Sequence, residues 1–454
     1  MSNNGIDGFK GPVFRPDDVG YDDARTIFNS MIDKRPAYIA QCADAEDVVS
    51  ALAFGRQRGL PISVRSGGHS VAGNSLVEDG LVVDMRNMSA VSVDPDAGTA
   101  TVGGGATWSH FDRAAEPHGL ATTGGRVSTT GVAGLTLGGG SGWFERKFGL
   151  ACDNLISVEL VTADGRRLTA SEDENSELFW ALHGGGGNFG IATSFEFRLH
   201  PLPVVTLALL LYTPDRGPEV ARHYRDFAEQ APDEVGGGML YLTGPPEEFV
   251  PEQMQGQRVL GMGVMYAGTE AEARQVAAPL LELSPDGQMI AEMPYAELQC
   301  ALDDPPGFRN YWSAEHLEEF PDDAIDRFCA RSEDMIVPSP SQQIALPWGG
   351  AVTRNAGDWP LTSRQARWTV HPFGLWDDSD HDERGKAWAR ATCADVKPYA
   401  TGDVYLNFTG DEGEGRIQAG FGDRYDRLAA VKAEWDPDNI FRQNHNLKPV
   451  AEPA

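Results

Sequence analysis

Glycine is distributed unevenly along this chain, and its clusters constrain the fold more than any other feature. The chain has 52 glycines among 454 residues, clearly more than the roughly 7% that is usual for proteins. The clusters lie at 67–68, 103–105, 124–125, 131–140 and 184–190, and hydrophobic or β-branched residues separate them. Glycine at this density marks tight turns and places where the backbone approaches a ligand closely.

The first cluster follows a predicted strand. The strand is expected over Leu60–Val64, and it runs directly into Arg65-Ser66-Gly67-Gly68-His69-Ser70. Two adjacent glycines let successive backbone amides face one anion, such as a pyrophosphate. Arg65 adds positive charge, and His69 lies on the same loop. Taken alone, His69 is more often an ordinary loop histidine than a functional one.

The later clusters do not match the common nucleotide motifs. Residues 131–142 are predicted to form a long glycine loop. Gly185–Gly190 has the pattern G-x-G-x-x-G, but a dinucleotide fingerprint needs a strand before it and a helix after it. Here a short helix over 178–182 is expected before the glycines and a strand over 191–199 after them, so a Rossmann site is rejected. The sequence also contains no P-loop, no H-E-x-x-H zinc motif and no G-x-S-x-G hydrolase elbow.

Residue periodicity predicts an α+β chain with a boundary near Pro201 and Pro203. Before the prolines, the pattern predicts a helix capped by Asp44 and ended by Gly59, several short strands, and a hairpin around Asp164-Gly165. After them, strand and helix candidates mix, as in a sheet covered by helices on one face. The expected strands there are 206–212, 258–266, 342–353 and 365–376, and the expected helices lie around 220–227, 269–283, 321–335 and 382–395. A strand over 404–408 and a helix over 423–435 are expected to close the chain.

Charge and cysteine content exclude some classes of function. The chain carries 67 acidic and 37 basic residues, a net charge of −30, which repels nucleic acid and anionic membranes. The N-terminus shows no signal-peptide pattern, and no apolar stretch is long enough to span a bilayer. The five cysteines form no C-x-x-C pair, so we expect a reducing, cytoplasmic location and no metal site. These cysteines are Cys42, Cys152, Cys300, Cys329 and Cys393.

Several ordered segments together resemble the berberine-bridge-enzyme-like FAD-linked oxidases of the vanillyl-alcohol-oxidase superfamily, which have a PCMH-type FAD-binding fold. The segments are Arg35–Tyr38, Val64–His69, Gly134–Gly142, Arg146–Asn154, Gly184–Ile191, Tyr405–Phe408 and Trp435–Asn446. They cover the first 200 residues and the last 50, whereas the middle matches only loosely. The resemblance implies an FAD-binding domain over 1–203, a substrate-binding domain over 204–400 built on an antiparallel sheet covered by helices, and a C-terminal segment over 401–454 that returns to the FAD domain.

The resemblance implies that FAD is bound covalently, through the 8α carbon of the flavin and His69. A neutral imidazole nitrogen is a competent nucleophile for such a bond. Many relatives carry a second link through a cysteine, but Val127 occupies that position here, so a single link is expected. For each glycine below, a plain turn is about as plausible as a cofactor contact. The residues expected to contact FAD are Arg65, Ser66, Gly67, Gly68, His69, Ser70, Gly131, Gly134, Gly138, Gly139, Gly140, Gly142, Asp153, Asn154, Gly190, Ile191, Asn444 and Asn446.

The candidates for catalysis are His371, Tyr405 and Asn407. His371 stands on the predicted strand 365–376, at the approximate position where relatives place a polar catalytic residue. An ordinary histidine pKa near 6.5 suits a base at neutral pH, although a plain core histidine is slightly favoured. Tyr405 and Asn407 would share one face of the predicted strand 404–408, so both are expected to face the flavin. The tryptophans of the middle segment are more often core residues than pocket residues.

We therefore expect an FAD-dependent oxidase that acts on an alcohol or amine group of a small substrate, such as an aromatic compound or a natural product. Hydride would pass to flavin N5, and O2 would accept the electrons to give H2O2. Thr130 lies near the position that controls oxygen access in relatives, so dehydrogenase behaviour stays open. A sugar oxidase and a flavin-containing protein that sequesters a drug-like compound are the alternatives. We expect a monomer or a homodimer.

Overall fold

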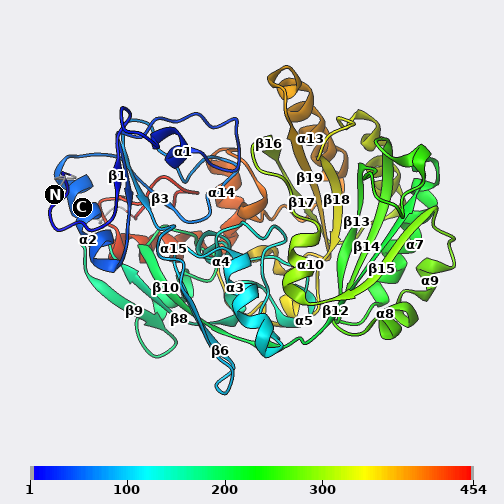
Figure 1. Cartoon of the computed structure of the whole chain (residues 1–454), viewed down its shortest axis with the longest axis horizontal. Coiled ribbons are helices and arrows are strands. Elements are labelled where there is room, and N and C mark those ends of the chain that lie inside the picture. Colours follow the sequence, from blue (N-terminus) through cyan, green and yellow to red (C-terminus); the bar gives the residue numbers. More distant parts are fainter. Residues whose placement is uncertain (1–4, 451–454) are drawn as a thin grey trace.

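The computed structural model describes residues 5–450, whose sheets form two groups (Figure 1). A cavity is lined by residues of both groups. The first sheet has the order β1-β2-β4-β3, in which β2, β4 and β3 are parallel and β1 is an antiparallel edge strand. Helix α2 (Ala45–Gln57) follows β2, and the Asp44 side chain caps it by accepting a hydrogen bond from the Asp47 backbone N–H. The strands of this sheet are β1 (Val13–Phe14), β2 (Tyr38–Gln41), β3 (Ile62–Arg65) and β4 (Leu81–Asp84).

The second sheet is antiparallel throughout, with the order β5-β6-β10-β8-β9. Its hairpin between β8 and β9 turns at Gly165, whose positive φ of 86° suits glycine. A short pair, β7 (Leu120–Ala121) with β11 (His200–Pro201), lies beside it. The strands of this sheet are β5 (Val91–Asp94), β6 (Thr99–Gly103), β8 (Leu155–Val161), β9 (Arg167–Ser171) and β10 (Ile191–Arg198).

The third sheet is large and antiparallel, with the order β15-β12-β14-β13-β18-β19-β16, and β17 also pairs with β19. Successive residues of a strand face opposite sides of the sheet. On β12, Ala208 and Leu210 pack in the core beneath the helices, while Leu207 and Leu209 face the cavity. Its strands are β12 (Val205–Tyr212), β13 (Val235–Thr243), β14 (Arg258–Tyr266), β15 (Gly287–Met293), β16 (Arg309–Trp312), β17 (Glu315–Leu317), β18 (Gln342–Pro347) and β19 (Trp368–Trp376).

A layer of helices covers one face of this third sheet, and the opposite face forms a wall of the cavity, where α10 (Tyr295–Ala301) shares a small hydrophobic cluster with Leu207 and Met265. The covering helices include α7 (Gly217–Gln230), α11 (Asp322–Arg331) and α13 (Asp382–Val396). The chain therefore has the predicted α+β fold with a helix-covered antiparallel sheet. The remaining helices are α1 (Tyr21–Arg25), α3 (Trp108–Ala115), α4 (Val132–Leu137), α5 (Glu145–Phe148), α6 (Ser176–Ala181), α8 (Glu270–Val276), α9 (Ala278–Leu281), α10 (Tyr295–Ala301), α12 (Ala351–Arg354), α14 (Glu414–Phe421) and α15 (Tyr425–Trp435).

The last part of the chain packs against the first part. Residues of 404–447 share one hydrophobic core with β6, β8 and β10, and Figure 1 shows α15 among the N-terminal elements. Lys432 of α15 is fully buried and forms an ion pair with Asp436. The same ammonium donates to the carbonyl oxygens of Asn188 and Phe441. The exact domain bounds at 203 and 400 stay a prediction.

Three predicted elements were wrong. Residues 131–142 are not only a loop, because α4 forms within them where Val132, Ala133 and Leu137 pack in the core. Residues 404–408 are not a strand; no strand pairs with them, and 406–408 form one 3-10 turn. The strand expected over 342–353 ends at Pro347, where two glycines with positive φ precede α12. Within residues 5–450, no helix has the length and apolar character that a membrane crossing requires.

Candidate functional site

A cavity of about 1000 Å³ lies between the glycine loops and the face of the third sheet opposite α7, α11 and α13. Its walls come from the loop after β3, the 125–138 segment with α4, the 184–191 segment, the third sheet, and the C-terminal segment. The wall that the third sheet forms is apolar, and includes Leu207, Leu209, Leu240, Leu242 and Met265. A pocket of this kind, largely apolar with a few convergent polar groups, is typical of a cofactor and substrate site.

The loop after β3 presents free backbone donors to this cavity. Within the described chain, the N–H groups of residues 67–70 donate to no protein acceptor, although the Gly68 carbonyl accepts from Phe28. Glycine is required at Gly67 because a Cβ there would lie 2.2 Å from the Gly131 backbone nitrogen. Gly68 also needs glycine, since its φ is +78°. The result is a row of unpaired amides that suits an anionic ligand.

Arg65 lies behind this loop and not in the cavity. Its guanidinium donates to the carbonyl oxygen of Ala24, within α1, and to that of Thr26, just after α1. Its Nε lies 3.2 Å from the position that a Cβ on Gly68 would occupy. Burial and the neighbouring Arg86 lower the pKa of Arg65 to about 10, so it keeps its charge at neutral pH and makes the loop more favourable for an anion.

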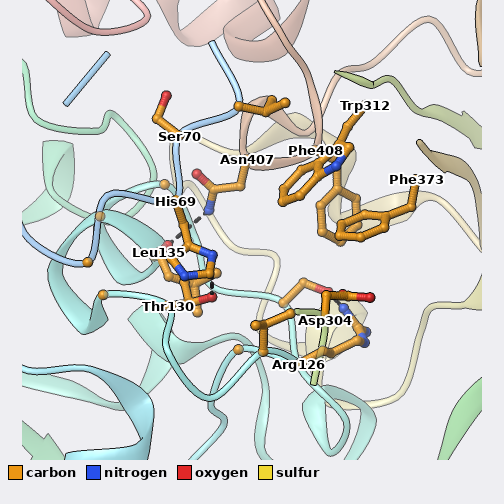
Figure 2. Close-up of a pocket in the computed structure, with 18 of the residues that line it drawn as sticks. His69, Ser70, Arg126, Thr130, Leu135, Asp304, Trp312, Phe373, Asn407 and Phe408 are labelled. Carbon is orange, nitrogen blue, oxygen red and sulfur yellow. Dashed lines mark hydrogen bonds between the residues drawn. The ribbon is translucent and has the colours of Figure 1, made fainter. Parts of the chain in front are cut away.

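His69 projects from the same loop into the cavity (Figure 2). Its Nε2 lies 2.9 Å from the Thr129 hydroxyl and its Nδ1 lies 3.3 Å from the Thr130 hydroxyl. Phe28 stacks on the ring, with a centroid separation of 4.2 Å. Burial, followed by the charge of Arg65, lowers the pKa of His69 to about 4. The imidazole is therefore neutral at physiological pH.

Across the cavity from His69, aromatic rings form a continuous wall (Figure 2). Trp312 stacks on Phe373 with centroids 4.2 Å apart, and His371 stacks on Phe408 at 4.4 Å. The two stacks meet edge to face, since His371 lies 5.6 Å from Phe373. The Trp312 indole N–H is buried and finds no acceptor among residues 5–450. The wall therefore suits a flat or apolar ligand that also offers one hydrogen-bond acceptor.

Two charged side chains, Arg126 and Asp304, lie on the same side of the cavity (Figure 2). Arg126 is held by Glu145, with a shortest N–O distance of 3.0 Å, and by the Ser141 hydroxyl. Asp304 accepts one hydrogen bond, from the Gln342 side chain at 3.0 Å. Burial and the nearby Asp303 raise the pKa of Asp304 to about 7. Its charge is therefore poised to change near neutral pH.

Comparisons with known proteins assign the chain to a family. Residues 36–171 match the family described as FAD binding domain, and residues 404–448 match the family described as berberine and berberine like. The (R)-6-hydroxynicotine oxidase of Paenarthrobacter nicotinovorans is 30% identical over 97% of both chains. The chain belongs to the berberine bridge enzyme-like family of FAD-linked oxidoreductases. Its fold matches the crystal structures of 6-hydroxy-D-nicotine oxidase from Arthrobacter nicotinovorans (TM-score 0.86, 26% identity, 97% and 98% of the two chains) and of berberine bridge enzyme from Eschscholzia californica (TM-score 0.86, 22% identity, 99% and 98%).

Many of the residues predicted to bind the cofactor of this FAD-linked oxidoreductase line the cavity. They come from segments far apart in sequence that the fold brings together. A large polar cofactor fits the polar groups of this cavity. Within the described chain these are the unpaired amides of residues 67–70, the neutral His69, and two buried atoms without a protein partner, the Ser66 hydroxyl and the side-chain Oδ1 of Asn444. The predicted cofactor residues that line the cavity are Ser66, Gly67, Gly68, His69, Ser70, Gly131, Gly134, Gly138, Gly190, Ile191 and Asn444.

Asp153 and Asn154 lie outside the cavity and are occupied by structural contacts. Asp153 forms a buried ion pair with Arg364, with N–O distances of 2.6 and 2.9 Å. The Asn154 amide donates to the Phe148 and Leu150 carbonyls. We therefore assign these two residues to holding the 148–154 turn and not to direct cofactor contact. Arg65, Gly139, Gly140, Gly142 and Asn446 also lie outside the cavity lining.

Tyr405 is fully buried behind the glycine loop, whereas Asn407 reaches the cavity. The Tyr405 hydroxyl accepts hydrogen bonds from the backbone N–H groups of Gly140 and Ser141, both at 2.8 Å. Burial raises the pKa of Tyr405 to about 12. The Asn407 amide nitrogen donates to the Leu135 carbonyl and to Tyr405, which leaves its Oδ1 as an acceptor. Tyr405 therefore positions Asn407 and the loop, and we withdraw its direct catalytic role.

His371 lines the cavity as predicted, but its environment changes its chemistry. Its Nδ1 lies 2.8 Å from the Ser313 carbonyl, so this nitrogen carries the proton and Nε2 is the acceptor. Burial lowers the pKa of His371 to about 4. A base of this strength is weak at neutral pH, and hydrogen bonding to substrate is the role that fits it better. Of the middle-segment tryptophans, Trp312 lines the cavity, while Trp368, Trp376 and Trp388 are core residues.

Asp304 is a site residue that sequence reasoning missed. It stands in an irregular segment after α10, and no motif surrounds it. The only available signal was the doublet Asp303-Asp304 followed by two prolines, which reads as an ordinary surface turn.

Proposed function

We propose that this protein is an oxidase with FAD bonded to His69, which oxidises an alcohol or amine group of a small molecule and uses O2 as electron acceptor, giving H2O2. The observation that carries the proposal is the position of His69. Its neutral imidazole lies in the cavity, on the loop that holds the unpaired amides and opposite the aromatic wall. A relative that is 30% identical is named as an oxidase of the small molecule (R)-6-hydroxynicotine, which supports the same class of reaction here.

Bound flavin would supply the hydride acceptor for the reaction. The residues of the chain would do the rest. The amides of 67–70 would hold the anionic part of the cofactor, and the apolar face of the third sheet would keep water from the substrate. The Oδ1 of Asn407 and the Nε2 of His371 would accept hydrogen bonds from the hydroxyl or amine under oxidation.

A single covalent link is part of this proposal. Val127 lines the cavity at the position where a second, cysteine link would require sulfur. Cys152 is fully buried against Arg364 and lies outside the cavity. Within residues 5–450, Cys300 is the one cysteine that lines the cavity, so it is the residue to examine if a second link exists.

The decisive experiment is acid denaturation of the purified holoprotein beside His69→Ala. The flavin spectra of pellet and supernatant are then compared. We expect flavin in the wild-type pellet and in the His69→Ala supernatant. Flavin in the supernatant of both proteins would refute the histidyl link. Flavin in the pellet of both would place a link elsewhere, with Cys300→Ala as the next variant, and protein without flavin would refute the oxidase proposal.

A further inference from the structure

The charges that line the cavity are nearly all negative. The acidic lining residues are Glu247, Glu297, Asp303 and Asp304, and within the described chain Arg126 is the one lysine or arginine among the lining residues. Arg126 is already paired, because its guanidinium forms an ion pair with Glu145 and donates a hydrogen bond to the Gly142 carbonyl. Because the whole chain is acidic, an acidic lining by itself does not indicate a cation-binding site. A carboxylate whose hydrogen-bond and ion-pair partners differ from those of its neighbours does.

Asp304 differs from the adjacent Asp303 in its hydrogen-bond partners. The adjacent Asp303 is fully engaged, since it accepts from the Ser128 backbone N–H at 2.6 Å and from the Ser128 hydroxyl at 2.5 Å. Asp304 has only the neutral amide of Gln342, and in the described part of the chain no lysine or arginine forms an ion pair with it. A carboxylate with one neutral donor, beside a second carboxylate and partly removed from water, is destabilised until a cation approaches it.

The surroundings of Asp304 favour one chemical class of cation. Trp312, Phe373 and Phe408 form the aromatic wall next to it (Figure 2). Aromatic faces attract ammonium groups, most strongly where water is excluded. A carboxylate beside aromatic rings is therefore a complementary site for an ammonium group on an apolar body.

We propose that Asp304 is the residue that selects a cationic amine as the substrate, with the ammonium group between its carboxylate and the aromatic wall of Trp312, Phe373 and Phe408. This inference rests on the proposed function and narrows its substrate class to small molecules that carry an ammonium group. The charged or titratable groups around Asp304 are Asp303 on the same segment, Arg126 on the same side of the cavity (Figure 2) and His371 on β19. The pKa of His371 is about 4, so this ring adds no positive charge that would compete with the substrate.

The test is a binding measurement on the flavin-loaded protein without O2. The probe is benzyltrimethylammonium, and its uncharged partner is neopentylbenzene, in which carbon replaces the nitrogen. Perturbation of the flavin absorbance reports both dissociation constants. We expect the wild type to prefer the cation at least about tenfold, which corresponds to about 1.4 kcal/mol.

Three variants make the result specific. Asp304→Asn keeps the size of the side chain and removes the charge, so the preference for the cation is expected to disappear. Asp304→Glu keeps the charge and is expected to retain most of the preference, which also shows that the segment tolerates substitution. Glu297→Gln removes an exposed carboxylate of the same cavity and is expected to change neither constant, so it controls for the general attraction of an acidic protein.

The outcomes separate this inference from the proposed function. Flavin-loaded wild type that binds both probes equally would overturn the selection of amines and leave the oxidase intact. An equal loss of preference in Asp304→Asn and Glu297→Gln would overturn the assignment to Asp304, because it would show a diffuse charge effect. Protein that carries no flavin would contradict the proposed function itself.

Discussion

The buried ion pair between Lys432 and Asp436 gives the sharpest prediction about how the chain holds its C-terminal segment. Neither side chain has any exposure to solvent, and the Nζ–Oδ2 distance is 2.6 Å. All three donors of the ammonium are used, because it also donates to the Asn188 and Phe441 carbonyls at 2.7 and 2.9 Å. Asn188 in turn donates to the carbonyls of Gly185 and His445. The pair therefore joins α15 to the cavity-lining 184–190 segment.

Lys432→Met keeps the length of the side chain and leaves the Asp436 carboxylate buried without a cation. Two backbone N–H groups, of Ile440 and Phe441, would still reach the carboxylate, but they do not neutralise it. Breaking a buried pair in this way costs about 3–5 kcal/mol of unfolding free energy. At roughly 2–4 °C per kcal/mol for a domain of 150–250 residues, the melting temperature is expected to fall by about 6 °C or more.

The measurement is thermal unfolding followed by circular dichroism and by flavin fluorescence at matched flavin content. Lys448→Met is the control, because Lys448 pairs with Glu414 on the surface and such pairs contribute little. Adding Asp436→Asn to Lys432→Met is expected to restore part of the loss by removing the buried charge. A melting temperature for Lys432→Met within about 2 °C of that of the control would refute the reasoning, because it would mean a loss under about 1 kcal/mol.

Three further predictions follow from the site. Gly67→Ala is expected to destabilise the flavin-free protein because the new Cβ would lie 2.2 Å from the Gly131 nitrogen. Gly134→Ala is the control on helix α4, where a Cβ meets nothing within 4 Å, and it is expected to stabilise the protein by up to about 1 kcal/mol. Equal melting temperatures for the two variants would contradict the steric argument. Tyr405→Phe leaves two buried N–H groups of the glycine loop without their acceptor and is expected to lower stability by about 2–3 kcal/mol; a variant as stable as the wild type with unchanged flavin retention would show that the hydroxyl does not hold the loop. Because the pKa of Asp304 is raised to about 7, its negative charge is present above that pH and lost below it. Binding of benzyltrimethylammonium is therefore expected to weaken as the pH falls from 8 to 6, whereas the Asp304→Asn variant is expected to bind it independently of pH. A wild type whose affinity does not change between pH 8 and pH 6 would contradict this prediction.

Features that depend on neighbouring residues in the sequence could be predicted. The Asp44 cap of α2 and the hairpin at Gly165 depend on a few adjacent side chains, and the structure confirms them. The glycine loop after β3 belongs to the same class. Its conformation follows from two adjacent glycines after a strand, so the sequence already indicated unpaired amides beside His69.

Features that depend on distant contacts could not be predicted in the same way. The run Val404–Phe408 has the residues of a strand, but no strand lies beside it, and its conformation is fixed by Tyr405 meeting backbone amides more than 260 residues away. Strand propensity describes a residue that fits a pleated sheet, and it gives no partner. The alternation argument for Tyr405 therefore failed, while Asn407 reaches the cavity for a different reason, the hydrogen bond from its amide to the Leu135 carbonyl.

The pKa values of the site residues also depend on distant contacts, so the sequence could not predict them. Sequence reasoning named His371 as a candidate base because an isolated histidine titrates near neutral pH, and it did not consider Asp304, whose carboxyl does not titrate there when isolated. Burial exchanges the two, with a pKa of about 4 for His371 and about 7 for Asp304. The exchange depends on burial in one cavity and, for Asp304, on the neighbouring Asp303, whereas the hydrogen bonds with Ser313 and Gln342 oppose the two shifts. In this chain the choice between candidate acids and bases is therefore made by tertiary structure, and the substrate class that we propose rests on the surroundings of Asp304 and not on the flavin motifs.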